Sequence, residues 1–316
     1  MKRFAIALIA LTLFAQASWA ADTVVRIGYL RNDLHHLAAW TAIEKGFFRM
    51  EGLNVEVAGI FNAGPEEMSA FASKSIDMGY LGMAPSVTGV ANKAAGIKAV
   101  ALANSEGSSI IVGKDSPIRD VQGLKGKSVA IPGYSTVQDF LLRKALATVG
   151  LDAGKVNIIV VKPPEMIIAL GSGQIDAFIA WEPHATKAVT KGIGRVLVQS
   201  SEIWPGHPCC VVAVENGFYK DNPAAVKAFA AAHVKAIAYI KNHPDEAVKI
   251  GVKYTGMDED TVQRAMRNIT YEHIIKEGDV KEYLQYLIRF GYVKPLDQDA
   301  FVRQYVDTPT EGGRNK

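Results

Sequence analysis

Cysteine is scarce in this sequence, with two residues among 316. Two cysteines are too few for a fold held together by several disulfides. An excess of charge of one sign is also missing, because 35 lysines and arginines stand against 32 aspartates and glutamates. A balance so close to neutral gives no sign of a nucleic-acid partner or of binding to an anionic membrane. The G-x-S-x-G, H-E-x-x-H and phosphate-loop motifs of common enzymes are absent as well.

The N-terminus carries a short apolar run, from Phe4 to Ala15, preceded by Lys2 and Arg3. Ser18-Trp19-Ala20 follows and has the small-x-small pattern of a cleavage site. This order predicts a secretory signal peptide over residues 1–20, cleaved after Ala20. A membrane anchor is the alternative, but about 12 apolar residues are short for a span that needs about 20. We therefore expect a soluble, monomeric mature protein in the periplasm.

Short β-rich runs alternate with amphipathic stretches along the chain. Strands are expected at 24–30, 55–61, 78–81, 97–103, 110–112, 128–131, 156–161, 177–180, 195–198 and 209–214. Helices are expected at 37–47, 66–72, 85–93, 136–149, 165–170, 184–190 and through most of the chain after 224. This order is typical of α/β domains with mostly parallel sheets and helices on both faces.

Two segments of the chain are similar to each other. Ser75–Pro85 and Gly173–Pro183 both contain Ile-Asp, an apolar strand and a proline that opens a helix. Asp77 and Asp176 are expected to bond to nearby backbone. The similarity predicts two doubly wound α/β lobes that face each other, with a ligand cleft at the carboxyl ends of their strands.

The chain then has to cross between the lobes twice. Residues 21–108 and 215–316 are expected to form the first lobe, and residues 113–207 the second. Segments 109–112 and 208–214 are the expected crossings. Two crossings form a hinge that allows the lobes to close.

Six segments carry a resemblance to a known family: Arg26–Leu30, Ala42–Phe48, Glu51–Val57, Ser75–Tyr80, Asp115–Lys127 and Ile175–Pro183. In this order they are similar to the nitrate/sulfonate/bicarbonate class (NitT/TauT-type, NMT1-like) of ABC-transporter substrate-binding proteins. The resemblance implies a type II periplasmic-binding-protein fold that closes on a small-molecule solute. It also implies docking on an ABC permease with its ATPase at the inner membrane.

Small residues precede two of the expected helices, at Gly82-Met83-Ala84 and at Tyr134-Ser135-Thr136. The free N–H groups and the dipole of a helix start favour an anion, and Ser or Thr caps such a helix. We predict that both segments line the cleft and bind an anion without a cationic side chain. The alternative for the second segment is a plain helix cap that faces water.

Trp181 and Glu182 follow the strand expected at 177–180. Trp181 would form an apolar wall of the cleft, and Glu182 would accept hydrogen bonds. A carboxylate beside an anion is unfavourable unless it is protonated or paired, so Glu182 favours a ligand with a cationic or N–H-donating part. The alternative is a packing aromatic next to a capping carboxylate.

Tyr29, Arg31 and Asn32 end the first strand, where the family's ligand loop would begin. Arg31 suits a bidentate contact with a carboxylate or sulfonate, unless it is simply solvated. Glu106 and Ser108 lie near the first expected crossing, where they would contact the ligand or support the hinge.

His35 and His36 are adjacent, and neighbours on a helix point about 100° apart, so at most one is expected to face the cleft. His207 precedes Cys209 and Cys210, which invites a metal site. Alternation along a strand would place the two thiols on opposite faces, and a disulfide between neighbours demands a strained ring. We therefore expect both cysteines to pack as small apolar residues, and we predict no metal and no cofactor.

These expectations favour a solute receptor rather than an enzyme. The first candidate for the solute is a sulfonate- or nitrate-like anion, and the alternative is a vitamin precursor or an N-heterocyclic or amine ligand. A secreted enzyme that uses His35 or His36, Glu182 and Cys210 is more remote, because no nucleophile–base–orienter trio is legible. A sensory domain on the same scaffold is the third alternative.

Overall fold

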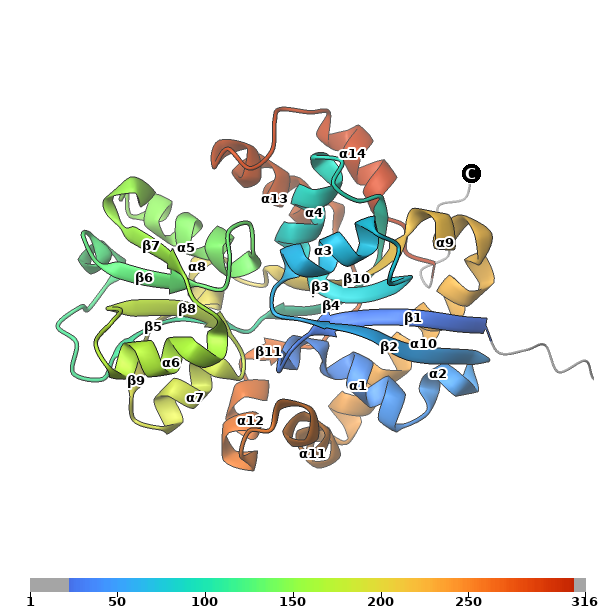
Figure 1. Cartoon of the computed structure of the whole chain (residues 1–316), viewed down its shortest axis with the longest axis horizontal. Coiled ribbons are helices and arrows are strands. Elements are labelled where there is room, and N and C mark those ends of the chain that lie inside the picture. The colour runs from blue at the N-terminus through green and yellow to red at the C-terminus, as the bar shows by residue number, and fades with distance from the viewer. Residues whose placement is uncertain (1–22, 310–316) are drawn as a thin grey trace, which may run out of the picture.

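Two β-sheets, each covered by helices, divide the molecule into two lobes (Figure 1). The computed structural model describes residues 23–309. The predicted signal peptide and its cleavage after Ala20 lie outside the described residues. Within residues 23–309, no helix combines the length and the apolar character needed to cross a membrane.

The first lobe contains a six-stranded sheet in the order β11-β4-β10-β3-β1-β2. Its strands are β1 (Thr23–Leu30), β2 (Leu53–Phe61), β3 (Met78–Gly82), β4 (Ile97–Glu106), β10 (Pro208–Glu215) and β11 (Ile269–Thr270). The pairs β1–β2 and β1–β3 are parallel, whereas β10 pairs antiparallel with both β3 and β4.

The second lobe contains a five-stranded sheet in the order β7-β6-β8-β5-β9. Its strands are β5 (Ser108–Gly113), β6 (Ser128–Ile131), β7 (Asn157–Val160), β8 (Ala177–Trp181) and β9 (Gly194–Gln199). The pairs β6–β7 and β6–β8 are parallel, and β5 is antiparallel to β8 and β9.

Helices cover both faces of each sheet. In the first lobe, α3 and α4 lie on one face of the sheet, and α1 and α10 lie on the other (Figure 1). The helices before β10 are η1 (Leu34–His36), α1 (Leu37–Glu44), α2 (Phe47–Met50), α3 (Gly64–Ala72), α4 (Met83–Ala91), η2 (Val121–Leu124), α5 (Val137–Thr148), η3 (Ala153–Lys155), α6 (Pro163–Gly171), α7 (His184–Thr190) and α8 (Ser200–Ile203). Those after β10 are α9 (Asn216–Asp221), α10 (Pro223–Asn242), α11 (Pro244–Thr255), α12 (Glu259–Met266), α13 (Glu277–Arg289) and α14 (Gln298–Tyr305).

The expectation of mostly parallel sheets needs correction, because both sheets are mixed. The antiparallel strands β5 and β10 are the ones that arrive from the other lobe. They therefore enter their sheets from the end opposite to the strands that belong to local strand–helix–strand units.

The crossings between the lobes also lie before the expected segments. β4 belongs to the first sheet and β5 to the second, so the first crossing is at Gly107 rather than at 109–112. The return passes through residues 200–207, because β10 is already part of the first sheet at Pro208 and 208–214 is not a free linker. The Glu106 side chain accepts a 2.9 Å hydrogen bond from Gly206 N, so the two crossings contact each other.

The similarity of the two Ile-Asp segments has a structural counterpart. Asp77 accepts a 2.8 Å hydrogen bond from Arg26 N on the strand beside β3. Asp176 accepts a 2.8 Å bond from Ser128 N on the strand beside β8. The prediction that both aspartates bond to nearby backbone is confirmed, and each ties two parallel strands of its lobe together.

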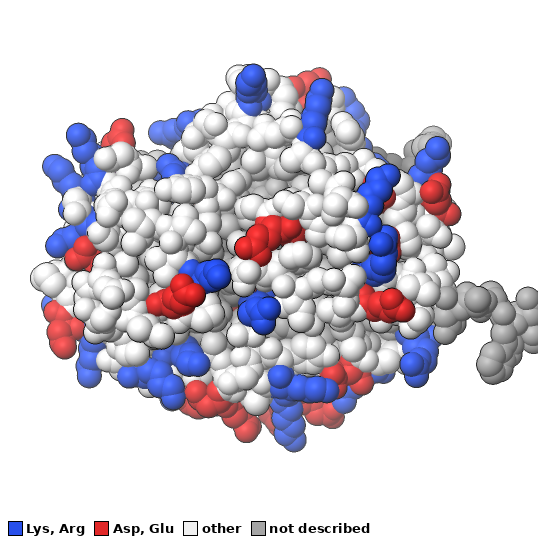
Figure 2. Space-filling model, in the orientation of Figure 1, with Lys and Arg blue, Asp and Glu red and all other residues white. Residues whose placement is uncertain are grey.

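The lobes are closed against each other. Phe140 of α5 packs on Tyr283 of α13, with ring centroids 4.5 Å apart, and Lys144 forms a 2.7 Å ion pair with Glu282. On the face shown in Figure 2, side chains of both charges are interspersed, with acidic and basic groups near the middle as well as along the edge. The closed arrangement brings the carboxyl ends of β1, β3 and β8 to one place.

Candidate functional site

A small cavity lies between the two lobes. About 10 Å³ of it is open to the centre of a water-sized sphere, which is room for about one water. Both lobes contribute to its lining, which consists of Leu30, Asp33, His35, Gly64, Gly82, Pro85, Thr136, Val137, Gln138, Trp181, Cys209 and Cys210.

Three helices begin at this cavity. Gly64 is the first residue of α3, Gly82 is the N-cap of α4 and Thr136 is the N-cap of α5. The first backbone N–H groups of a helix have no partner within it, and the dipole adds partial positive charge there. Two of these helix starts belong to the first lobe and one to the second, so helix starts of both lobes lie at the cavity.

Glycine is required where these helix starts meet. A Cβ atom at Gly64 would lie 2.5 Å from Pro85 Cγ, and one at Gly82 would lie 2.8 Å from Val137 Cγ2. The second contact crosses from the first lobe to the second. The small residues that precede α4 therefore allow the lobes to close.

Polar side chains of the second lobe add donors. Trp181 is 2% exposed, and its indole N–H has no hydrogen-bond partner among the described residues. Gln138 Nε2 donates a 3.0 Å hydrogen bond to Ser108 Oγ, which fixes the amide against β5. An anion bound beside this N–H would give it the partner that it lacks, but the cavity would have to widen from its present room for about one water.

The opposite side of the cavity is a cluster of buried ionisable groups. His35 Nδ1 lies 3.4 Å from Cys209 Sγ and 3.8 Å from Cys210 Sγ, and the two sulfur atoms are 3.7 Å apart. His35 Nε2 lies 2.9 Å from the carbonyl oxygen of Gly107. Asp33 caps the turn by accepting a 3.0 Å hydrogen bond from His35 N.

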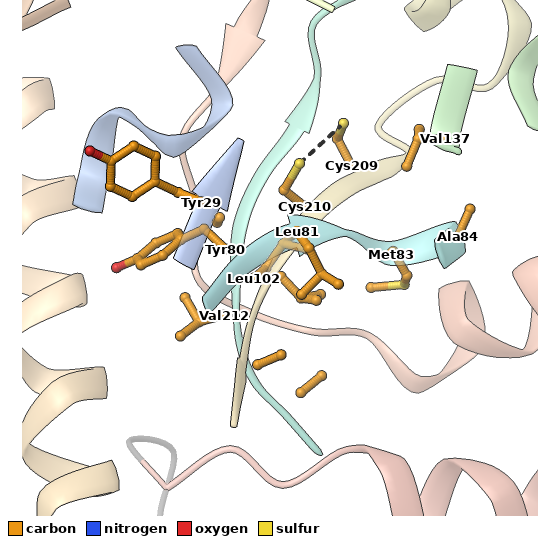
Figure 3. Packing of buried hydrophobic residues seen from close by; sticks show 14 of the residues in the cluster. Tyr29, Tyr80, Leu81, Met83, Ala84, Leu102, Val137, Cys209, Cys210 and Val212 are labelled. Carbon is orange, nitrogen blue, oxygen red and sulfur yellow. Dashed lines mark hydrogen bonds between the residues drawn. The ribbon is translucent and has the colours of Figure 1, made fainter. Parts of the chain in front are cut away.

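The expectation that Cys209 and Cys210 point to opposite faces is wrong. Figure 3 shows their sulfur atoms facing each other. The pairing of β10 with β4 shifts register between Pro208 and Cys210 and again after Cys210. This irregularity breaks the alternation of side chains that a regular strand would impose.

The buried groups shift one another's pKa values. Burial raises the pKa of Asp33 to about 7, although the charge of His35 opposes the shift. Burial favours neutral His35, but the negative charges of Cys209 and Asp33 outweigh it and raise its pKa to about 9. Burial disfavours the Cys209 thiolate, yet hydrogen bonding from Cys210 and the charge of His35 hold its pKa well below the usual range. Both shifts favour an imidazolium–thiolate pair over a neutral imidazole beside a thiol.

Four of the residues predicted to bind the ligand line this cavity: His35, Gly82, Thr136 and Trp181. The adjacent His36 is buried beside it, where Nδ1 accepts a 3.0 Å hydrogen bond from Leu30 N. One histidine of the pair therefore lines the cavity and the other secures the end of β1.

The other first-lobe candidates lie away from the cavity lining. Tyr29 packs edge-on against Trp40, Arg31 is exposed and Asn32 turns the chain with φ +51°. Met83 and Ala84 are fully buried in the first turn of α4 and are not among the residues that line the cavity.

The other candidate residues of the second lobe and of the crossing also lie at separate places outside the cavity lining. Tyr134 is 51% exposed and, with Ser135, lines a separate surface groove. Glu106 bridges the crossings, and Ser108 supports Gln138 from behind. Glu182 is buried and accepts hydrogen bonds from Thr186 N at 3.0 Å and from Asn268 Nδ2 at 2.7 Å.

Sequence reasoning missed several residues of the lining. Gly64 and Pro65 follow β2 as Gly82 and its neighbours follow β3, and this repeated helix start was the available signal. Asp33 carried the signal of a residue that caps a helical turn. No pattern in the sequence singles out Gln138 or the bulge at Cys209.

Comparisons with known proteins identify the family of this chain. The sequence matches the NMT1-like family over residues 18–252. A Brucella abortus protein that is named only as a binding protein is 30% identical over 312 residues, covering 94% of this chain and 96% of that protein. The taurine-binding periplasmic protein of Escherichia coli is 31% identical over 220 residues, covering 67% of each.

A solved structure shows the same fold. The periplasmic nitrate-binding protein NrtA from Synechocystis PCC 6803 is similar with a TM-score of 0.79 at 21% identity, covering 90% of this chain and 86% of that chain. The expected periplasmic-binding-protein fold, with two α/β lobes, is confirmed. Because the family match spans well over half of its length, this chain belongs to the NMT1-like family.

Proposed function

We propose that this protein is the solute receptor of an ABC importer and that it closes on a small oxyanion of the sulfonate or nitrate class. The observation that carries the proposal is the meeting of three helix starts, from both lobes, at one buried cavity. Relatives named for taurine and nitrate binding support the same solute class. The proposed role is binding without catalysis.

Hydrogen-bond donors, rather than cationic side chains, support an anion in the cavity. No lysine or arginine is among the lining residues, so backbone N–H groups, the Trp181 N–H and the Gln138 amide would supply the hydrogen bonds. Helix starts bind oxyanions in this way without a cationic side chain. The imidazolium of His35 offsets the acidic groups on the opposite side.

Closure follows from the division of these donors between the lobes. A solute held by α3 and α4 alone lacks the contacts of α5 and Trp181, so it binds the closed form more tightly than the open one. Differential affinity of this kind shifts the population towards closure. A permease with its ATPase in the inner membrane would then recognise the closed, exported, monomeric receptor.

One observation favours a second solute class. Asp33 is a buried carboxyl group in the cavity lining, and it would accept a hydrogen bond from an N-heterocyclic or amine solute. Such a solute would bind through its N–H groups to Asp33 rather than through its oxygens to the helix starts. Substitution of Asp33 separates the two classes, since Asp33→Asn removes the charge that an N–H donor needs.

The test is calorimetric titration of the purified mature protein with taurine, short alkanesulfonates, nitrate and carboxylates, and with amines and pyrimidines. We expect 1:1 binding of at least one oxyanion with micromolar or tighter Kd, equivalent to about −8 kcal/mol or better. Tight binding of an amine or pyrimidine that Asp33→Asn abolishes would replace the anion with the second class. Absence of binding by every solute to folded protein would overturn the receptor function.

A further inference from the structure

His35, Cys209 and Cys210 place three metal-binding atoms together on the floor of the cavity. All three residues are buried, and their Nδ1 and Sγ atoms lie within 4.8 Å of one another. His35 belongs to η1 and the cysteines to β10, both in the first lobe. We propose that these atoms bind one thiophilic d10 metal ion, Zn²⁺ or Cu⁺.

The spacing of the three atoms matches what one ion requires. With Zn–S bonds of about 2.3 Å and a Zn–N bond of about 2.0 Å, a tetrahedral ion sets S···S at about 3.8 Å and S···N at about 3.5 Å. The structure has 3.7 Å between the sulfurs, and 3.4 and 3.8 Å from Nδ1 to each sulfur. An ion would therefore fit with adjustments of a few tenths of an ångström.

The orientation of His35 leaves the correct nitrogen for a metal. A carbonyl oxygen only accepts hydrogen bonds, so the 2.9 Å contact with Gly107 O requires a proton on Nε2. Nδ1 is then the free ligand, and it faces the sulfurs. A backbone carbonyl that holds the second imidazole nitrogen is the usual outer-shell partner of a metal-binding histidine.

Charge and ligand softness select the ion. A bound divalent ion would be held by a neutral imidazole and two thiolates, so the ion and its three ligands together carry no net charge. Two thiolates and an imidazole suit Zn²⁺ and Cu⁺ and do not suit Mg²⁺ or Ca²⁺, which prefer oxygen. Neutrality reduces the cost of burying the site.

Three protein ligands leave one coordination position for the cavity. Zinc sites with three protein ligands hold water or another small ligand in the fourth position. All three ligands lie in the first lobe, so metal binding does not need a closed receptor or the proposed oxyanion. The metal site therefore stands apart from the proposed function.

The experiment uses the mature protein, reduced with a phosphine and stripped of metal with a chelator. Zn²⁺ is titrated against a chromophoric chelator, and Cu⁺ against a Cu⁺-specific chelator under nitrogen, without solute. We expect 1:1 binding with submicromolar Kd for at least one ion. Cys209→Ser, Cys210→Ser and His35→Ala should each weaken binding at least 100-fold. His233→Gln, a change at a buried first-lobe histidine that bonds to Tyr80, should not.

X-ray absorption of the wild-type 1:1 complex needs no variant and covers the case in which a variant fails to fold. We expect two sulfur atoms at about 2.2 to 2.3 Å and one nitrogen at about 2.0 Å. A shell of nitrogen and oxygen alone, equal affinity in the cysteine variants, or no binding by reduced folded protein would each overturn the proposal. Oxyanion titration of metal-free and metal-loaded protein is scored separately, so failure of one proposal is distinguishable from failure of the other.

Discussion

The backbone N–H of Leu34, in the first lobe, donates a 3.1 Å hydrogen bond to the carbonyl oxygen of Glu182, in the second. Asn268 reinforces this contact, because its Nδ2 donates to Glu182 Oε1 at 2.7 Å. Both bonds cross between the lobes, so an opening of the cleft would have to lengthen or break them. The closed state thus buries the Glu182 carboxyl group and supplies its partner at the same time.

Asn268→Leu should weaken closure, because Glu182 Oε1 would then be buried without that partner. Loss of a hydrogen bond to a charged group costs about 1.5–3 kcal/mol, so we expect solute Kd to rise about tenfold or more. Small-angle scattering with solute should show a larger radius of gyration. Asn92→Ala is the control, because Asn92 Nδ2 bonds to Tyr292 O within the first lobe. Unchanged Kd and scattering in Asn268→Leu would contradict the role of this contact.

Trp181→Phe should lower oxyanion affinity about tenfold, because it keeps an aromatic wall and removes the unpartnered N–H donor. Trp40→Phe is a matched control. Trp40 is also buried with an indole N–H that lacks a partner among the described residues, but it stacks on Tyr254 in the first-lobe core. Calorimetry should show the loss in the first variant alone. Equal losses in both variants would mean that packing, rather than the donor, matters.

Gly82→Ala should hinder closure, because the added Cβ would lie 2.8 Å from Val137 Cγ2 of the other lobe. We expect solute affinity to fall at least tenfold. Val137→Ala in the same chain should restore part of it by removing the clashing methyl. Gly278→Ala is the control, since a Cβ there meets no atom within 4 Å. A double variant that is no better than Gly82→Ala would place the strain elsewhere.

The buried side chain of His233 should make the folded protein less stable in acid. It is buried between Tyr80 OH and Leu102 O, and burial lowers its pKa to about 4. An unfolded histidine titrates near 6.5, so as pH falls from about 7 to about 4 the unfolded chain gains a proton that the folded protein excludes. Over that pH range, the lowered pKa of His233 alone reduces the free energy of unfolding by about 3 kcal/mol.

The measurement is the free energy of unfolding in urea at several pH values. His233→Gln should lose less stability than the wild type between pH 7 and pH 4. NMR titration of the wild-type imidazole gives a direct check: a His233 that takes up its proton near pH 6.5 in the folded protein would contradict the assignment.

Most elements were predictable because the signals are local. Apolar strands such as β3 and β8, each bounded by an Ile-Asp turn and a proline, can be read from short windows. The direction of β5 and β10 was not predictable, because antiparallel pairing depends on which lobe the chain comes from. An apolar run such as that of β10 can belong either to a linker or to a sheet, and the sequence does not distinguish them. The second crossing was therefore predicted too late in the chain.

The candidate site divides in the same way. Gly82, Thr136 and Trp181 follow strands and could be found from the rule that ligands bind at carboxyl ends. Gln138 lies in the first turn of α5, and its hydrogen bond to Ser108 Oγ of β5, which no sequence pattern announces, fixes its amide. The two thiols could not be paired from sequence, because the register shift beside them is seen only once β10 is paired with β4.

Gly107, at the first crossing between the lobes, holds one group of each lobe. Its carbonyl oxygen accepts hydrogen bonds from both Glu182 N and His35 Nε2, each at 2.9 Å. A backbone rotation at Gly107 that separates the two lobes must therefore also tilt the His35 imidazole or break its hydrogen bond. The hinge movement between the lobes and the position of the imidazole that lines the cavity are thus coupled through a single peptide group.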